Sequence, residues 1–439
     1  MRLPGGISAG APSAPRGALS HESAVHRNPA RRGFRTLGDD DLQHTVLAGG
    51  GNALGICSIG QRETTIERPL RALDARVLEA MLPYFTTEYG NASSIYTLGR
   101  HAMQAVDSAR EEVADILGCR PTEVTFTGNG SESDNLAIKG IAFASQKKGN
   151  HLVTSPIEHH AVLHTCQYLE RFGFKTTYVP VDSYGRLDPD DIGRALTDQT
   201  ALVSIMYANN EVGTIEPVAE IGRICRARKI PFHVDAVQAG GSLPIDVAEL
   251  NADLLSLSAH KFYGPKGVGI LYARQGVRLL PQVQGGSQER GKRAGTENVA
   301  GIVGAATALR LAYEDLPRVM PRVSALRDRL IAGVLSIAGS QLTGHPTERL
   351  PNNASFVFEG VEGESILLSL DLLGVAASTG SACTSGSVDP SHVLLAMHLP
   401  VELAHGSLRL TLGKDNTDED VDAILTALPG IIEKLRQLR

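Results

Sequence analysis

Residues 254–273, LLSLSAHKFYGPKGVGILYA, decide the fold of this chain. Two short apolar runs, 254–259 and 267–273, are separated by a histidine, a lysine, two aromatic residues, a Gly-Pro turn and a second lysine, Lys266. Because the connection is too short for a crossover helix, the two runs are predicted to form an antiparallel hairpin. Lys261 then lies in the turn of the hairpin, among neighbours that are unusual for an ordinary surface lysine.

Upstream of the hairpin, further strand-like runs alternate with helical patterns. Apolar residues recur at helical spacing in 161–173 and 217–229, between such runs. This alternation is typical of α/β proteins in which helices cover both faces of a mostly parallel sheet. We therefore predict a seven-stranded sheet whose other strands are 124–127, 151–156, 176–181, 201–208 and 231–237.

Shifts in the pattern predict three parts of the chain. Residues 1–65 mix Gly, Ala, Ser, Pro and Arg with little periodicity, which predicts a disordered or atypical extension. Residues 66–315 form the predicted large α/β domain. Residues 316–439 form a predicted smaller α+β domain, with a helix at 321–339 and a closing helix at 418–438.

Composition excludes several classes of function. The chain has 42% hydrophobic and 21% charged residues, in the range of soluble globular proteins. No apolar run approaches the roughly eighteen residues of a membrane-spanning helix, so no membrane is expected as a partner. A net charge of −6 gives no basic footprint for nucleic acid. No two cysteines form a CxxC pair, which argues against a disulfide framework and a zinc site and favours a reducing compartment. The five cysteines are Cys57, Cys119, Cys166, Cys225 and Cys383.

The N-terminus leaves the location of the protein open. The first 37 residues contain six arginines and one acid, Glu22, a composition that resembles a transit peptide. A natural tail or a mis-assigned start codon explains the same stretch. We expect a cytoplasmic protein, with mitochondria as the alternative if the arginine-rich stretch is a transit peptide.

Polar residues at the ends of predicted strands are candidates for a binding site, because ligands of open α/β sheets collect there. Gly130 and Ser131 follow the strand 124–127 in a Gly-rich turn that opens a helix. Backbone N–H groups and the helix dipole at such a turn bind anions such as phosphate. Taken alone, an ordinary capped helix start is the simpler explanation of this motif.

Three other strand ends carry side chains that could act on a ligand. Asp235, with Gln238 close behind it, could keep a proton on a heterocyclic nitrogen or could cap the next helix. His159 could stack on a flat ligand or could be a buried, hydrogen-bonded histidine. Lys261 suits Schiff-base chemistry, because a desolvated amine loses its charge and becomes nucleophilic, although a lone turn lysine is usually a solvated charge.

Together these features are the parts of a pyridoxal phosphate site. The phosphate would bind at the helix start, the pyridine nitrogen at the acid, and the aldehyde at the lysine. Each alternative explanation is reasonable singly, but the joint order of the four features favours the cofactor.

Four longer motifs extend the pattern: SLSAHKFYGPKGVGILYA (256–273), YANNEVGTIEP (207–217), GGSQERGKRAGTENVAGIVG (285–304) and STGSACTSGSVDPSHVLLAM (378–397). These motifs resemble the NifS/IscS group of cysteine desulfurases, and the similarity covers roughly residues 72–439. This group belongs to the fold-type I, class V aminotransferase-like enzymes that use pyridoxal phosphate.

The resemblance implies a role for each matched residue and a homodimeric assembly. Lys261 bonds to the cofactor's aldehyde, Asp235 pairs with its pyridine nitrogen, and Gln238 hydrogen-bonds its ring hydroxyl. His159 stacks on the ring and can move protons. The remaining implied contacts are to the phosphate (Gly130, Ser131, Ser258 and His260), to the phosphate of a partner subunit (Thr296) and to the substrate carboxylate (Asn210 and Arg409).

Cys383 is the decisive residue of the implied reaction. Its small, polar neighbours in SACTSG fit a mobile exposed loop. The implied enzyme converts L-cysteine to L-alanine, while Cys383 as a thiolate takes the sulfur as a persulfide and passes it to an IscU/NifU-like iron–sulfur scaffold protein. No metal of the protein's own is implied, although Cys383 can contact an iron–sulfur cluster transiently. The loop most resembles NifS-like members associated with nitrogenase and nitrogen fixation.

The chain departs from the family pattern at two places. Members normally begin with a strand close to YLDNNATT, whereas this chain has CSIGQRETTIERPLRA at 57–72, which puts folding of the small domain and full activity in question. Ser287 stands where glycine is usual. If that position requires a positive φ, serine is strained by roughly 1 kcal/mol or more.

Two alternative functions stay open at this point. Another fold-type I enzyme, an aminotransferase or a selenocysteine lyase, would share Lys261 and Asp235, but a transaminase has no use for a mobile thiol at Cys383. A non-catalytic scaffold is favoured by the altered N-terminus and disfavoured by the intact lysine, acid, histidine and loop cysteine.

Overall fold

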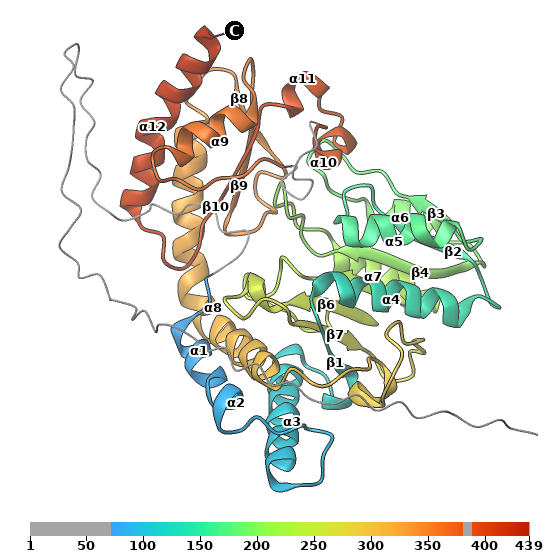
Figure 1. Cartoon of the computed structure of the whole chain (residues 1–439). Coiled ribbons are helices and arrows are strands. Elements are labelled where there is room, and N and C mark those ends of the chain that lie inside the picture. The colour runs from blue at the N-terminus through green and yellow to red at the C-terminus, as the bar shows by residue number, and fades with distance from the viewer. Residues whose placement is uncertain (1–71, 381–388, 439) are drawn as a thin grey trace, which may run out of the picture. The chain divides into compact units, whose positions relative to one another are not determined.

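The computed structural model describes residues 72–380 and 389–438, so the predicted N-terminal extension and Cys383 lie outside the described residues. Its main element is a seven-stranded sheet in the order β1-β7-β6-β5-β4-β2-β3 (Figure 1). All seven predicted strands are confirmed: β1 Val124–Thr127, β2 His151–Thr154, β3 Lys175–Tyr178, β4 Thr200–Met206, β5 Phe232–Asp235, β6 Leu254–Ser258 and β7 Gly269–Ala273.

The strand directions position the predicted site. β7 pairs antiparallel with β6 and with β1, whereas β6, β5, β4, β2 and β3 pair in parallel. The predicted hairpin is confirmed, with Ser258 opposite Gly269 and a short 3-10 helix, Ala259–Lys261, in its turn. Lys261 therefore lies at the carboxyl edge of the parallel strands.

Helices cover both faces of the sheet, as the apolar sequence of its strands requires. Leu152 of β2 packs into a core with α4 and α5, while its neighbour Val153 packs into a core on the opposite face with α3 and α8. The helices of this part are α1 Ala75–Met81, α2 Pro83–Thr86, α3 Thr97–Leu117, α4 Gly130–Ser145, α5 His160–Glu170, α6 Pro189–Ala195 and α7 Val218–Ala227.

The C-terminal part has its own core around an antiparallel sheet in the order β10-β9-β8. Helices α9 and α12 and the second half of α8 pack on this sheet through residues such as Ile366, Ile424 and Leu330. The elements are β8 Ser340–Thr343, β9 Asn353–Phe358, β10 Ser407–Thr411, α9 Gly363–Asp371, α10 His392–Ala396, α11 Val401–Ala404 and α12 Asp418–Gln437.

The long helix α8, Val299–Val334, corrects the predicted helix at 321–339. The helix begins 22 residues earlier and contains Pro317 and Pro321, which usually end or kink a helix. Its first half packs against the large sheet and its second half against the three-stranded sheet, so burial on two cores outweighs the lost hydrogen bonds. The predicted domain boundary at 316 falls inside this helix and stays a prediction. Within the described ranges, no helix combines the length and apolarity needed to cross a bilayer.

Candidate active site

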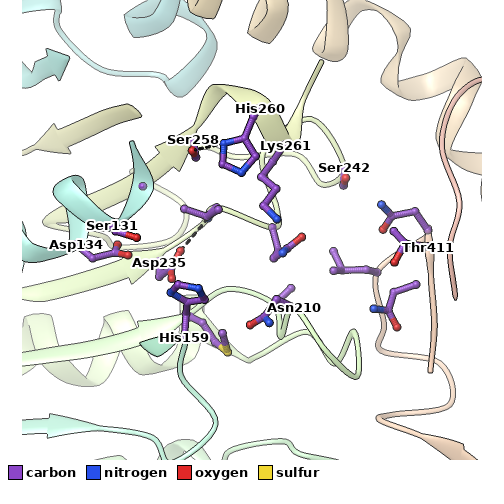
Figure 2. A pocket seen from close by; sticks show the side chains of 18 of the residues that line it. Ser131, Asp134, His159, Asn210, Asp235, Ser242, Ser258, His260, Lys261 and Thr411 are labelled. Atoms are coloured by element: carbon purple, nitrogen blue, oxygen red, sulfur yellow. Dashed lines mark hydrogen bonds between the residues drawn. The ribbon is translucent and has the colours of Figure 1, made fainter. Parts of the chain in front are cut away.

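Ten of the predicted site residues line one cavity of about 400 Å³. Figure 2 shows the side chain of Lys261 pointing into the cavity, with Asp235 and His159 toward one side and Thr411 toward the other. The volume suits a ligand of cofactor size. The ten residues are Gly130, Ser131, His159, Asn210, Asp235, Gln238, Ser258, His260, Lys261 and Arg409.

One predicted residue that the structure describes is not brought into this cavity, and another lies outside the described residues. Thr296 is exposed in the loop before α8 and does not line it. Its predicted contact with the cofactor of a partner subunit stays a prediction. Cys383 belongs to residues 381–388, outside the described residues, so its predicted role also stays a prediction.

The start of α4 provides the candidate phosphate contacts. Gly130 and Ser131 are its first residues, where backbone N–H groups have no carbonyl partner within the helix. Asn129 caps the helix, since its Oδ1 accepts a hydrogen bond from Glu132 N–H at 2.9 Å. A Cβ on Gly130 would lie 2.7 Å from Val237 Cγ2, so a glycine allows this close approach. The same turn can therefore both cap the helix and bind an anion.

The hairpin adds two polar groups beside this helix start. Ser258 Oγ and His260 Nδ1 lie 2.9 Å apart (Figure 2). Burial, and then the positive charges of Lys261 and Lys266, lower the pKa of His260 to about 4. The ring is therefore neutral at physiological pH, and with Ser258 it offers hydrogen bonds rather than charge.

Asp235 ends β5 and is almost fully buried. Its Oδ1 accepts a hydrogen bond from Val237 N–H at 3.0 Å. Burial raises the pKa of Asp235 to about 6, while this hydrogen bond and the charge of Lys261 lower it. A buried carboxylate of this kind is stabilised by a positive charge, such as the protonated nitrogen of a heterocycle.

Asp134 is a cavity residue that the sequence analysis missed. It is 1% exposed, and no hydrogen bond from the described residues reaches its Oδ1. Burial, and second the charge of Asp235, raise the pKa of Asp134 well above its usual range, as expected where two carboxyls share a low-dielectric site. Its spacing from Gly130 was the signal that could have identified it, because residues four apart lie on one helix face.

His159 lies at the start of α5, where its Nδ1 accepts a hydrogen bond from Ala161 N–H at 3.0 Å. Burial, followed by the charges of His160 and Lys261, lowers the pKa of His159 to about 4. The imidazole is therefore neutral, with its proton on Nε2. A neutral flat ring at the cavity wall is suited to stacking on a flat ligand.

The three-stranded sheet forms the opposite wall through β10. Arg409 is 5% exposed and donates hydrogen bonds to Asn210 O at 2.9 Å and to Ser378 Oγ at 3.2 Å. Because Asn210 follows β4, Arg409 joins the two sheets across the cavity. Three further polar residues of this wall were not predicted from the sequence: Asn352, Asn353 and Thr411.

The expected strain at Ser287 is not present. Ser287 has a φ of −88°, which any residue adopts. The non-glycine residues of this loop with a left-handed backbone are instead Glu289 and Arg290, with φ of 46° and 56°. Glu289 is fixed by a buried ion pair with Arg110, with oxygen–nitrogen distances of 2.7 and 2.9 Å, and by Phe126 N–H at 3.0 Å. A serine at position 287 therefore carries no backbone cost.

A buried carboxyl on the loop of Asn210 predicts a pH dependence of stability. Burial raises the pKa of Glu216 to about 8, partly offset by the hydrogen bond that it accepts from Leu187 N–H. Between pH 6.5 and 8 the folded protein then binds a proton that the unfolded chain lacks, so this group's contribution to stability falls as pH rises. In cofactor-free protein, the free energy of unfolding should therefore fall between pH 6.5 and 8 by about 2 kcal/mol less in Glu216→Gln than in wild type.

Urea denaturation at both pH values measures this difference. Glu220→Gln is the matched control, because Glu220 is exposed four residues away and should leave the pH dependence unchanged. Equal pH dependence in wild type and Glu216→Gln would contradict the prediction.

Comparisons with known proteins agree with this geometry. Residues 72–424 match the aminotransferase class-V family. A protein named cysteine desulfurase IscS from Methanosarcina thermophila is 56% identical over 362 residues, covering 82% of this chain and 90% of the relative. A solved NifS-like protein has a TM-score of 0.79 at 41% identity, covering 83% of this chain and 98% of that one. A structure of SspA in complex with cysteine has a TM-score of 0.71 at 35% identity, covering 79% and 98%.

These matches confirm the predicted fold class, a seven-stranded mostly parallel sheet between helices with a smaller α+β part. The chain therefore belongs to the aminotransferase class-V family.

Proposed function

We propose that the protein is a pyridoxal-phosphate-dependent cysteine desulfurase, which converts L-cysteine to L-alanine and transfers the sulfur to Cys383 as a persulfide for iron–sulfur cluster assembly. The observation that carries the proposal is the convergence of Lys261, Asp235 and Arg409, from separate elements, on one cavity. The relatives named cysteine desulfurase and the cysteine complex of SspA support it.

The described residues fit this cofactor. Enzymes of the aminotransferase class-V family depend on pyridoxal phosphate in general. The start of α4, Ser258 and His260 offer donors for a phosphate, and Asp235 offers an acid for the ring nitrogen. When bound, the cofactor supplies an electron sink that weakens bonds at the Cα of an amino acid.

Each described side chain then has a task at a stated atom. Lys261 Nζ takes the proton from the substrate Cα and returns a proton to the product. Arg409 binds the substrate carboxylate through charge-assisted hydrogen bonds. The neutral ring of His159 would pack against the bound cofactor, and Asp235 would keep a proton on its ring nitrogen.

The sulfur transfer is assigned to Cys383. Its thiolate attacks the substrate sulfur; a sulfur–sulfur bond forms as the Cβ–S bond breaks, and the electron pair left on carbon takes up a proton to give alanine. Burial raises the pKa of Cys119, Cys166 and Cys225 to about 12. These three thiols are protonated at neutral pH and are poor nucleophiles, which favours Cys383 for the reaction.

The proposal includes partners and a location. We infer a homodimer in which Thr296 reaches the phosphate of the partner subunit, and the exposure of Thr296 is compatible with this contact. The sulfur acceptor is an iron–sulfur scaffold protein. The free cysteines Cys119, Cys166 and Cys225 support a reducing location such as the cytoplasm.

The test is to supply cofactor-loaded protein with L-cysteine. Alanine and persulfide on Cys383 should form in equal amounts in the first turnover, as measured by mass spectrometry. Amino transfer to a keto acid, or turnover of selenocysteine but not cysteine, would instead identify another fold-type I activity. Bound cofactor without any product would favour a non-catalytic scaffold.

Arg409→Gln should weaken recognition of the substrate carboxylate. Loss of hydrogen bonds between charged groups is expected to lower kcat/KM for L-cysteine by about 10- to 100-fold. L-Cysteine methyl ester, which has no carboxylate charge, should react with wild type and variant at rates within about twofold. An equal loss with both compounds would mean that Arg409 serves folding rather than carboxylate binding.

A further inference from the structure

Tyr263, two residues after Lys261, has an unusual backbone. Its φ is 64°, in the left-handed region that bulky L-residues rarely adopt. The conformation brings the Cβ close to the backbone and is strained, so surrounding contacts must stabilise it. The left-handed backbone of Tyr263 within this hairpin is therefore stabilised by contacts from outside the turn.

Two residues distant in sequence provide these contacts. The carbonyl oxygen of Tyr263 accepts a hydrogen bond from Asp74 N–H at 3.0 Å, and its hydroxyl accepts one from Lys414 N–H at 2.7 Å. Lys414 Nζ lies 4.3 Å from the centroid of the Tyr263 ring, within cation–π range. Lys414 Nζ also forms an ion pair with Asp74 Oδ2. We call these three residues the Asp74–Tyr263–Lys414 clamp.

Both outer residues of the clamp are anchored in their own elements. Asp74 caps α1 and accepts hydrogen bonds from Arg76 N–H and Arg76 Nη2, each at 2.9 Å. Arg76 first, and Lys414 as a further cause, keep the pKa of Asp74 well below its usual range, so this carboxyl is ionised at neutral pH. The turn of Lys414 is fixed to α8 by Arg322, which donates to Asn416 O at 2.5 Å.

The ion pair between Lys414 and Asp74 is largely shielded from solvent. The side chains of Lys414 and Asp74 are 21% and 9% exposed, so solvent screens their attraction less than that of a surface pair. The clamp thus combines a shielded ion pair, a hydrogen bond and a ring contact around one strained residue.

The clamp joins the two walls of the cavity. Tyr263 is two residues after Lys261, in the hairpin that forms one wall. Lys414 is three residues after Thr411, the last residue of strand β10, which carries Arg409 on the other wall. A shift at either side would change the separation of the amine from the guanidinium. We propose that the three residues of the Asp74–Tyr263–Lys414 clamp are positioning residues that fix Lys261 relative to Arg409. The clamp thereby fixes the amine of the substrate relative to its carboxylate. This catalytic part of the inference rests on the proposed function.

Four variants test the clamp. Lys414→Met removes the ion pair and the ring contact, and Tyr263→Phe removes only the hydroxyl. Lys414→Arg keeps the charge and should behave as wild type. Lys266→Met is the matched control, because Lys266 is an exposed lysine in the same turn and belongs neither to the clamp nor to the cavity lining.

The first measurement needs no cofactor. Hydrogen exchange of backbone amides at 261–264 and 412–416 in cofactor-free protein should accelerate in Lys414→Met and Tyr263→Phe, and stay unchanged in Lys414→Arg and Lys266→Met. Unchanged exchange in both clamp variants would overturn the proposal, whatever reaction the protein catalyses.

The second measurement separates positioning from mere stability. In loaded enzyme, Lys414→Met should lower kcat/KM for L-cysteine by about 10- to 100-fold, the expected cost of misplacing reacting groups by about 1 Å. The loss for L-cysteine methyl ester should be smaller, because the ester does not use Arg409. An equal loss for both substrates would overturn the positioning role. A wild type that makes no alanine would refute the proposed function, and the exchange data would still decide whether the clamp exists.

Discussion

Lys261→Ala should lower alanine formation from L-cysteine by about 10³-fold or more, because the variant loses both the amine that bonds to the cofactor and the base at the substrate Cα. The side chain of Lys261 points into the cavity that Asp235, His159 and Arg409 also line (Figure 2). Borohydride reduction followed by peptide mapping should label Lys261 with the cofactor in wild type. The variant should show no label at this peptide.

The control for this experiment is Lys266→Ala, five residues further along the hairpin turn. Lys266 is exposed and does not line the cavity, so its loss should leave both activity and labelling unchanged. Full alanine formation by Lys261→Ala would remove covalent attachment at this lysine from the proposed function.

Cys383→Ser should abolish persulfide formation and lower alanine release by about 10²-fold or more, since a hydroxyl does not accept sulfur. The first-turnover assay with L-cysteine measures both products. The expected loss is specific to the sulfur step, so binding of the cofactor to Lys261 should be unaffected.

Cys119→Ala is the matched control for Cys383. Cys119 is partly buried, and this burial, followed by the charge of Glu123, raises the pKa of its thiol to about 12, so it should contribute little thiolate. Alanine release at the wild-type rate by Cys383→Ser, or persulfide on Cys119, would contradict the assigned sulfur acceptor.

The strands and the centre of the site could be predicted because local sequence determines them. Strand-forming runs and turn residues located β1 to β7, and the short connection at 260–266 fixed the antiparallel direction of β7. Gly130, Asp235 and Lys261 follow different strands, and the carboxyl ends of parallel strands meet at one edge of a sheet. Their convergence in one cavity was therefore implied by their places in the chain.

Local rules failed where tertiary packing outweighs them. The apolar pattern predicted a helix that begins at 321, yet α8 begins at Val299 and continues through Pro317 and Pro321, because each half buries an apolar face on a different core. At Ser287, where glycine is usual in the family, strain was predicted if φ were positive. The left-handed non-glycine residues of the loop are instead Glu289 and Arg290, and a buried ion pair with Arg110 fixes Glu289.

By itself, the sequence determined the seven-stranded sheet, the hairpin of Lys261 and the polar residues at the strand ends, since each depends on residues close in the chain. Only the tertiary structure decided that Asn352 and Asn353 line the cavity, that Arg409 meets Asn210, and that Asp74 pairs with Lys414 across 340 residues. Such contacts depend on how separate elements pack. The sequence pattern within one segment does not predict which distant residue that segment will contact.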